Sequence, residues 1–327
     1  RAVGLLVIGP DGFLYGFTGQ TAYSDTDPET DHGVFFRLDY QANYSLVATL
    51  PHSIATDLLV GSDGAFYGGS AYEYWGDSAI NTTGMVKLTT TGAFTALGGN
   101  QGVLSPVPQV VGSDGAIYGT RSLQWGIAAQ SSVFRLDTAG NFTTIHQMNN
   151  TEGFLENYIL GSDGFIYATS QYGGTPTSTG TVLRLDNTGA VTFLHHFAPA
   201  DGLFPVGSLA IGADGAIYGV AQFGGTGAGT VYRVDTAGTF TVQHSFDWPT
   251  EGGFPERGLL LAKDGALYGV TSSAIFRVDS SGTVSFPVFP SQYIWPSSPL
   301  VQGGDCGLYG FATSFDPATG TSTGLIY

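Results

Sequence analysis

The sequence predicts an all-β protein, a seven-bladed β-propeller with four-stranded antiparallel blades, and three observations lead to this fold class. The first is a repeated motif such as VGSDGAIYGT at 111–120, whose copies place tyrosines 41–52 residues apart along the whole chain. A fixed period of roughly 20–50 residues indicates a repeat architecture. The seven motif tyrosines are Tyr15, Tyr67, Tyr118, Tyr167, Tyr218, Tyr268 and Tyr309.

The second observation is that each unit contains short runs typical of β-strands. GTVYRVD at 229–235 and GTFTVQHSF at 238–246 are rich in Val, Phe, Tyr and Thr and are bounded by Gly or Asp, as strands usually are. The third is that no window shows sustained helical periodicity. Each unit therefore predicts four strands, A to D, and seven units that close radially make a propeller. We expect residues 1–327 to form a single domain.

The turns between these strands carry their own signals. Asp-Gly joins strands A and B, and such a dipeptide predicts a tight hairpin in which both central residues have positive φ. Asp-Thr-Ala-Gly, as at 137–140, joins strands C and D, and its Asp side chain is expected to bond its own backbone. The seventh unit stops at GLIY, 324–327, so we expect the last blade to have three strands.

Charge restricts the possible partners of the chain. It has 10 Lys and Arg against 26 Asp and Glu, a net charge of −16. A nucleic-acid partner requires a cationic stripe, which excludes that class and disfavours polyanionic glycans. No apolar run approaches the ~20 residues that span a bilayer. Six of the ten bases share one position of strand C and are expected to pair within or between blades: Arg37, Lys87, Arg135, Arg184, Arg233 and Arg277.

Two further features concern the compartment. Cys306 is the single cysteine, so no internal disulfide forms, and we expect a buried, inert thiol. Asn-X-Ser/Thr triplets predict N-glycosylation if the chain is secreted. They begin at Asn43, Asn81, Asn141 and Asn149.

Propeller topology predicts where a site can lie. The A–B and C–D hairpins share one face and are short, whereas the B–C and D–A connections share the other face and differ in every blade. Variable loops on a rigid scaffold usually carry function, and an apolar cup with a few polar groups is the usual small-molecule site. The rings expected to bind substrate there are Tyr72, Trp75, Trp125, Tyr172, Phe204, Phe223, Trp248, Tyr293 and Trp295.

A few polar residues on this variable face are candidates for contact with a ligand. Asn157 and Gln222 are expected to bind substrate, and Arg257, Arg121 and Gln124 are candidate hydrogen-bond donors to a reacting group. A purely structural role remains an alternative for each of these polar residues and for the rings of the variable face. The rings would then fill gaps between blades, and the polar groups would satisfy loop backbone.

Signals for other chemistries are sparse. The sequence has no metal-ligand spacing, nucleophile elbow or phosphate loop, so no cofactor or metal is expected. Five acids in the D–A loops allow a glycosidase pair, but TEGFLEN, ADGLFPVG and TEGGFPERG indicate one repeated acid-Gly turn. His146, His196 and His244 are expected to be structural repeat positions. The five acids are Glu152, Glu156, Asp201, Glu251 and Glu256.

The motif order resembles a known family. D-G-x-hydrophobic-Y-G is followed by G-T-V-hydrophobic-R-hydrophobic-D and by an acid-Gly-x-x-Pro turn, which resembles the GloVer-type repeat of bacterial and fungal extracellular propellers. Blade 2 departs from it, with Lys87-Leu88-Thr89 in place of Arg-Leu-Asp. In its sequons, its lack of disulfides and its Trp-rich variable face, the chain is similar to the secreted fungal hetero-Diels–Alderases that make tropolone–sesquiterpenoid adducts.

This resemblance implies a secreted, metal-free pericyclase. Its diene would be an ortho-quinone methide, such as a tropolone derivative, and its alkene humulene or a relative. Such a reaction needs two apolar partners in near-attack geometry and a donor that polarises one of them. The alternatives are a carbohydrate-active propeller (polysaccharide lyase, glycosidase or lectin), with rings stacked on sugar faces, and a protein-interaction scaffold. The sequence carries no signal for an oligomeric state.

Overall fold

The computed structural model describes residues 2–18, 33–39, 41, 43–50, 54, 56–69, 84–97, 106–122, 131–149, 151–174, 178–288, 294–296, 298–303, 305–316 and 321–326. They form two compact units, residues 1–149 and 150–327. Within these ranges the structure is β-sheet with one short helix, α1 (Trp248–Glu251), so the all-β prediction is confirmed. No helix in the described ranges is long and apolar enough to cross a membrane.

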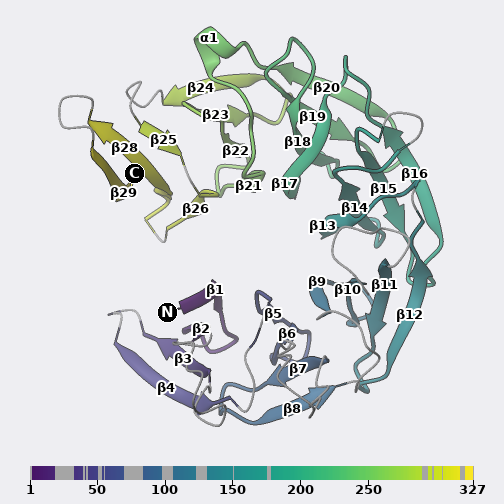
Figure 1. The fold of residues 1–327 in the computed structure, drawn as a ribbon, viewed down its shortest axis with the longest axis vertical. Coiled ribbons are helices and arrows are strands. Elements are labelled where there is room, and N and C mark those ends of the chain that lie inside the picture. The colour runs from purple at the N-terminus through teal and green to yellow at the C-terminus, as the bar shows by residue number, and fades with distance from the viewer. Residues whose placement is uncertain are drawn as a thin grey trace, which may run out of the picture. The chain divides into compact units, whose positions relative to one another are not determined.

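The described residues of unit 1 form three four-stranded antiparallel sheets, in each of which consecutive strands are neighbours (Figure 1). The strands are β1 (Ala2–Ile8), β2 (Leu14–Thr18), β3 (Val34–Leu38) and β4 (Tyr44–Thr49); β5 (Leu59–Val60), β6 (Phe66–Gly69), β7 (Met85–Leu88) and β8 (Phe94–Leu97); and β9 (Val107–Val111), β10 (Ile117–Ser122), β11 (Ser131–Leu136) and β12 (Phe142–Gln147).

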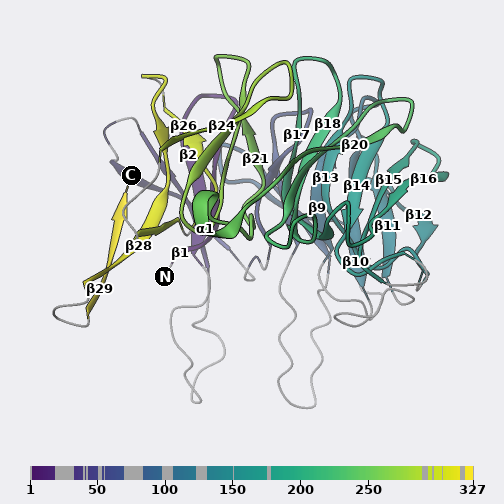
Figure 2. The ribbon, with the colours of Figure 1, turned by 90° about the horizontal axis from the view of Figure 1, so that it is seen from above.

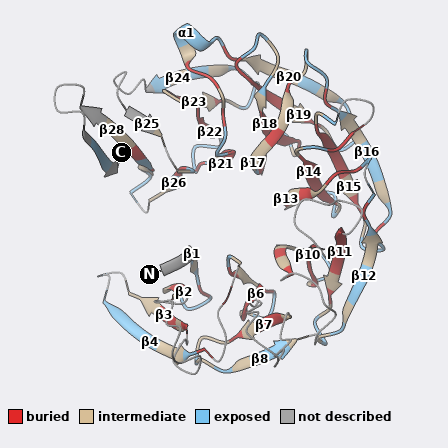
Figure 3. Cartoon of the chain, in the orientation of Figure 1, coloured by how far each residue is buried: buried red, intermediate tan, exposed pale blue. Residues whose placement is uncertain are grey.

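Unit 2 repeats this meander three times. Its four-stranded sheets are β13 (Leu155–Leu160), β14 (Ile166–Ser170), β15 (Thr181–Leu185) and β16 (Val191–His196); β17 (Leu203–Ile211), β18 (Ile217–Phe223), β19 (Thr230–Val234) and β20 (Phe240–Ser245); and β21 (Leu259–Leu261), β22 (Leu267–Val270), β23 (Ile275–Val278) and β24 (Val284–Val288). Strands β14, β15 and β18 are largely buried, whereas β16 is more exposed (Figure 3). In Figure 2, α1 lies near one end of the strands of this unit.

The seventh repeat differs from the other six. Its first strand is divided into β25 (Ile294–Pro296) and β26 (Val301–Gln302), and its second into β27 (Leu308–Tyr309) and β28 (Phe311–Asp316). β28 pairs with β25 and with β29 (Thr321–Ile326), while β26 and β27 form a separate two-stranded sheet. Pro299 lies between β25 and β26 and has no N–H to donate to a ladder. The described residues therefore form six four-stranded sheets and two small ones, and the count of seven blades is not confirmed.

The A–B turn differs from the tight hairpin expected from its Asp-Gly dipeptide. Gly61 N–H donates to the Ala65 carbonyl (2.8 Å), and Gly64 N–H donates to the Gly61 carbonyl (3.0 Å). Gly64 has φ +74°, but Asp63 is not among the described residues with positive φ. This pattern is a type I turn followed by a left-handed glycine. The prediction of positive φ at both central residues is wrong, because the Asp stays right-handed.

The carboxylate of the turn Asp links the turn to two strands. Asp114 Oδ1 accepts the Ala116 N–H (3.1 Å), and Oδ2 accepts the Tyr118 hydroxyl (2.9 Å). Arg135, on the third strand, donates from Nη2 to Asp114 (2.7 Å) and from Nε to the Tyr118 hydroxyl (3.1 Å). Similar clusters are found at Asp63, Tyr67 and Lys87, at Asp214, Tyr218 and Arg233, and at Asp264, Tyr268 and Arg277.

The two remaining bases of strand C also act within the scaffold. Arg37 lies over the Phe13 ring, 4.7 Å from its centroid. Arg184 lies over the Phe165 ring at 4.6 Å and donates to the Thr236 carbonyl of the neighbouring sheet (2.8 Å). The prediction that the bases of strand C pair within or between blades is therefore confirmed.

The C–D turn has the expected Asp geometry. Asp137 Oδ1 accepts the N–H groups of Ala139 (3.0 Å) and Asn141 (2.8 Å). The Asn141 side chain donates to Asp137 Oδ2 (2.9 Å), and Asn43 donates to Asp39 in the same way (2.8 Å). Two of the predicted glycosylation asparagines are therefore also turn residues. Asn149 is exposed, and Asn81 lies outside the described residues.

Cys306 is exposed, and the expectation of a buried thiol is wrong. The residue has φ +68°, and its N–H donates to the Gly303 carbonyl (3.1 Å). Cys306 therefore takes the place that the left-handed glycine has in the other A–B turns, which is the solvent-facing tip of a hairpin.

Acid should destabilise the fold through these turns. Burial alone would raise the pKa of Asp114, but the hydrogen bonds from Arg135, Tyr118 and Ala116 together lower it, and Asp63 and Asp214 show the same direction. A carboxyl whose folded pKa lies below its unfolded pKa of about 3.9 stabilises above that pH, and the stabilisation is lost as pH falls through the folded pKa. We expect a steep fall in Tm below about pH 4. Circular dichroism melts at each pH measure this, and equal Tm values at pH 3 and pH 6 would contradict it.

Candidate functional site

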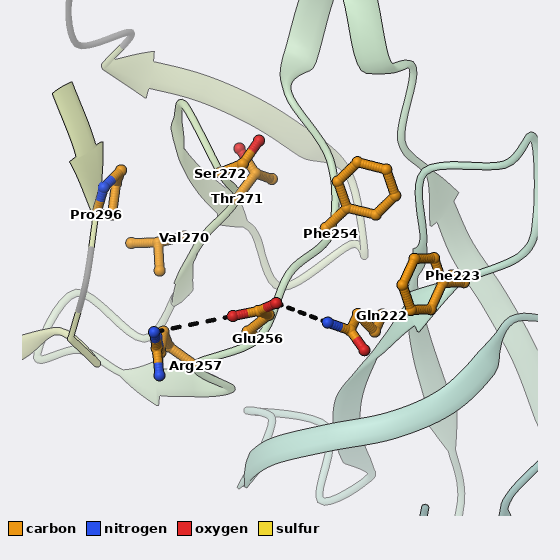
Figure 4. A pocket seen from close by; sticks show the side chains of 9 residues that line it. All are labelled: Gln222, Phe223, Phe254, Glu256, Arg257, Val270, Thr271, Ser272 and Pro296. Carbon is orange, nitrogen blue, oxygen red and sulfur yellow. Dashed lines mark hydrogen bonds and ion pairs between the residues drawn. The ribbon is translucent and has the colours of Figure 1, made fainter. Parts of the chain in front are cut away.

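One pocket in unit 2 brings together three of the residues predicted to form the site. Its volume is about 370 Å³, which is in the range of small-molecule sites. Gln222, Phe223 and Arg257 are the predicted members (Figure 4). The full lining consists of Gln222, Phe223, Phe254, Glu256, Arg257, Val270, Thr271, Ser272 and Pro296.

The pocket is built by connections of three successive sheets of unit 2. Gln222 and Phe223 end β18, the second strand of one sheet, and Val270 ends β22, the second strand of the next. The segment between β20 and β21, which contains α1, supplies Phe254, Glu256 and Arg257, and Pro296 ends β25. B–C and D–A connections therefore meet here, as predicted for the variable face.

Three polar side chains cross the pocket in a line. Gln222 Nε2 donates to Glu256 Oε1 at 2.6 Å, and Arg257 Nη2 lies 3.8 Å from Glu256 Oε2 (Figure 4). That second separation is too long for a hydrogen bond. The Arg257 and Glu256 side chains are 42% and 47% exposed. Among the described residues no hydrogen bond is recorded for the Arg257 guanidinium, so its donors remain open to a ligand.

The backbone beside Arg257 is fixed by a close approach of two sheets. Gly258 forms a parallel bridge with Ser208. Gly258 has φ +77°, and a Cβ at this position would lie 2.0 Å from the Ser208 nitrogen. A Cβ on Gly207 would lie 2.2 Å from the Gly258 nitrogen. Only glycine fits at either position, and the bridge therefore fixes the point from which the Arg257 side chain departs.

Comparison of the repeats separates scaffold residues from residues special to this pocket. The two positions before Asn157 and Ser208 hold Leu155-Glu156 and Val206-Gly207. The equivalent positions in the next sheet hold Glu256-Arg257. The acid–base pair is therefore confined to one of the three four-stranded sheets of unit 2, and the repeat does not require it.

An aromatic row continues from the pocket. We define it as Tyr172, Phe204, Phe223, Phe254 and Trp248, in order of contact. Successive ring centroids are 5.5, 6.1, 5.3 and 5.0 Å apart, and successive ring planes meet at 52°, 89°, 56° and 48°. Four of the five were predicted substrate-binding rings, and Phe254 joins them.

Two rings of the row belong to residues with a strained backbone. Phe204 has φ +58° and Phe254 has φ +56°. The Phe204 N–H donates to the Thr179 carbonyl (2.8 Å), and the Phe254 N–H donates to the Ala228 carbonyl (2.7 Å). Bulky residues rarely have positive φ, and such strain of about 1–3 kcal/mol per residue clusters at functional sites.

The acid-Gly turns are scaffold, as their repetition predicted. Asp201 pairs with His195, and Glu251 pairs with His244, each at 2.8 Å. His195 opposes Val182 on the neighbouring strand as His244 opposes Val231. The repeat histidine is therefore His195, and the assignment of His196 to that position is wrong because it is one residue out of register.

Two of the remaining acids also lie apart from the pocket lining. Burial raises the pKa of Glu156 on β13, and Glu152 is buried. Glu256 is the one acid among the pocket-lining residues in the described part of unit 2. The arrangement therefore lacks the two facing carboxylates of a glycosidase in this pocket.

Arg121 and Asn157 are engaged within their own sheets. Arg121 Nε donates to Ser132 (3.2 Å), Nη2 donates to Thr144 (2.5 Å), and the guanidinium lies 5.2 Å from the Phe142 centroid. Burial lowers the pKa of Arg121. Asn157 Nδ2 donates to Thr169 (3.3 Å).

Several predicted site residues cannot be placed from the described structure. The Trp295 backbone pairs with Thr313 in the sheet of β25 and β28. The others lie outside the described residues: Tyr72, Trp75, Gln124, Trp125 and Tyr293.

The sequence prediction missed Val270, Thr271, Ser272 and Pro296. An aromatic-Pro dipeptide occurs ten residues before the turn Asp in three repeats, at 204–205, 254–255 and 295–296. This register would have placed Pro296 at the pocket. The three residues that follow β22 carry no comparable signal, because Ser and Thr are common in loops.

The fold and the repeat place the chain among β-propellers, and three solved structures are similar to it. Streptogramin B lyase has a TM-score of 0.62 at 19% identity, over 94% of this chain and 89% of that one. Virginiamycin B lyase from Staphylococcus aureus has 0.61 at 16%, over 95% and 90%. Puromycin hydrolase has 0.58 at 14%, over 99% of this chain and 53% of that one. These neighbours are enzymes, and at such identities the likeness concerns the fold.

The family follows from the sequence itself. The chain belongs to the Gloeobacter/Verrucomicrobia repeat family, whose model matches residues 54–285. None of the curated protein sequences matches it significantly.

The strain at Phe254 can be measured with two substitutions. Phe254→Gly and Phe254→Ala both remove the ring, but only glycine adopts φ +56° without a steric penalty. We expect the Gly variant to have a free energy of unfolding about 1 kcal/mol higher than the Ala variant, which reverses their usual order in regular structure. Urea unfolding measures this difference. An Ala variant at least as stable as the Gly variant would show that the residue is not strained.

Proposed function

We propose that the chain is an enzyme that binds small apolar and aromatic molecules in the pocket, where Arg257 polarises a carbonyl group of one of them. A single observation carries the proposal. A guanidinium without a hydrogen bond among the described residues stands in a cavity walled by Phe223, Phe254 and Pro296. It occupies a repeat position that the neighbouring sheet fills with Gly207.

The reaction that we propose is a hetero-Diels–Alder addition. An ortho-quinone methide, such as a tropolone derivative, adds to a sesquiterpene alkene such as humulene. One C–C and one C–O σ bond form at the expense of π bonds, no group leaves, and no net proton is transferred. As the carbonyl oxygen gains negative charge in the transition state, a hydrogen bond from Arg257 strengthens. Phe223 and Phe254 hold the partners in near-attack geometry.

Glu256 positions the donor in this scheme. It accepts a hydrogen bond from Gln222 at 2.6 Å on one oxygen and faces Arg257 at 3.8 Å with the other. Because an exposed pair of this length contributes little binding energy, the guanidinium can turn toward a substrate carbonyl. No nucleophile is needed, and we propose that the enzyme requires no cofactor or metal.

We make three further proposals, on the domain organisation, the localisation and the partners of the protein. We propose that residues 1–327 form one seven-bladed domain with a three-stranded last blade, because the motif occurs seven times. We also propose a secreted protein, since three sequon asparagines are exposed: Asn43, Asn141 and Asn149. The bases of strand C are committed to the scaffold, which supports small molecules rather than nucleic acid as partners.

A carbohydrate-active propeller is the second candidate. Trp248 is 55% exposed and Tyr172 is 61% exposed, and exposed rings of this kind stack on sugar faces. A lectin-like or lyase site is compatible with this. A two-carboxylate glycosidase is disfavoured, because Asp201 and Glu251 are paired with histidines.

Replacement of Arg257 tests the proposal. With an ortho-quinone methide precursor and humulene as substrates, Arg257→Gln should slow adduct formation by about 10- to 100-fold without abolishing it, because a partly redundant donor contributes less than the 10²–10³ of a fully used one. Arg277→Gln, which removes an arginine bonded to Tyr268, is the matched control and should keep the rate per folded molecule. Equal rates for both variants, or no adduct with the unmodified protein, would contradict the proposed function. Complete loss of activity in Glu156→Gln would favour lyase or hydrolase chemistry.

A further inference from the structure

We propose that the aromatic row is a second subsite, which takes the elongated hydrocarbon arm of a ligand whose polar head lies at Arg257. This inference rests on the proposed function for the position of the head. It adds the class of substrate: a carbonyl-bearing head joined to, or reacting with, an extended apolar chain.

Continuity with the pocket is the first support. Phe223 and Phe254 line the pocket and are also the third and fourth rings of the row. From them the row extends through Phe204 to Tyr172 on one side, and to Trp248 on the other. A ligand that fills the cavity therefore meets an uninterrupted path of rings in either direction.

Exposure is the second support. Tyr172, Trp248 and Phe223 are 61%, 55% and 37% exposed, respectively. Scattered exposed apolar residues are normal, but contiguous exposed apolar patches usually mark binding sites. These three rings belong to one continuous chain of ring contacts, so they are not isolated exposed residues.

Backbone strain is the third support. Tyr172 with Phe204, and Phe223 with Phe254, are equivalent contacts one repeat apart. Both phenylalanines have positive φ. Glycine satisfies that backbone without strain, so the fold alone does not call for a ring there.

The chemistry of the row favours a hydrocarbon over a sugar chain. The three central rings, Phe204, Phe223 and Phe254, have no polar atom, and polar groups occur only at the two ends, on Tyr172 and Trp248. Successive planes meet at 48–89°, so the rings present edges and partial faces. Sugar rings stack on flat aromatic faces, and rings at these angles do not form one continuous flat face.

A homologous series of ligands tests the subsite on the full chain. The probes are tropolone and its 5-butyl, 5-octyl and 5-dodecyl derivatives, with Kd measured by isothermal titration calorimetry. A buried methylene contributes up to about fourfold in affinity, and about twofold is expected on half-exposed rings. Affinity should therefore rise steadily with chain length in the unmodified protein.

Four variants separate the two subsites. Tyr172→Ala and Phe204→Gly should remove most of the gain with chain length and leave the Kd of tropolone unchanged, and glycine also suits the positive φ of residue 204. Phe193→Ala removes a 39% exposed ring on β16 that is outside the row, and should leave the whole series unchanged. Arg257→Gln should weaken every member by the same factor. Circular dichroism confirms that each variant is folded.

The outcomes distinguish failure of this inference from failure of the proposed function. Affinity independent of chain length, or equal losses in Phe193→Ala and Tyr172→Ala, would overturn the subsite, while Arg257-dependent binding of tropolone would leave the proposed function standing. A length-dependent series that Tyr172→Ala flattens and Arg257→Gln does not change would support the row and overturn the role of Arg257. Binding of cellohexaose that Tyr172→Ala abolishes, without any gain along the alkyl series, would overturn a hydrocarbon occupant.

Discussion

The carboxylate of the A–B turn Asp is the interaction on which the rest of this structure depends. In all seven repeats its Oδ2 accepts the hydroxyl of the motif tyrosine, at 2.5–3.3 Å. In the sheets of Asp63, Asp114, Asp214 and Asp264, a base of the third strand joins the same oxygen. One side chain therefore fixes a turn and two strands at one end of the sheet. The connections at the other end of the sheet take no part in this interaction, and their sequences can therefore differ between repeats.

The pocket is formed where the connections differ in sequence between repeats. The neighbouring sheets share an aromatic-Pro turn and, at Gly207 and Gly258, an approach of two backbones so close that only glycine fits. Within this shared frame, one sheet places Glu256-Arg257 where its neighbour has Val206-Gly207. A charged pair held by a rigid repeat, beside rings that contribute apolar surface, suits a ligand with one polar head.

The sequence allowed much of the fold and part of the site to be predicted. The four strands per repeat and the scaffold role of the strand-C bases follow from period and spacing, because one interaction recurs at fixed positions. Gln222, Phe223 and Arg257 were found because they lie in the B–C and D–A connections, which were expected to form the variable face. Thr271 and Ser272 were not, since nothing in a short Ser/Thr segment indicates what it faces. The turn was predicted incorrectly because Asp63 is held by Tyr67 and Lys87, partners on other strands that turn statistics do not include. The burial of Cys306 was predicted incorrectly because the residue occupies the exposed, left-handed position that glycine has in the other A–B turns.

The central claim is that the pocket between Gln222 and Arg257 is the functional site, and a crystal structure of the protein with a bound tropolone–sesquiterpenoid adduct tests it most directly. The account predicts an oxygen of the tropolone part within hydrogen-bonding distance of the Arg257 guanidinium, and the terpenoid part in contact with Phe223 and Phe254. An adduct bound elsewhere, with Arg257 and Glu256 unchanged and facing solvent, would contradict it.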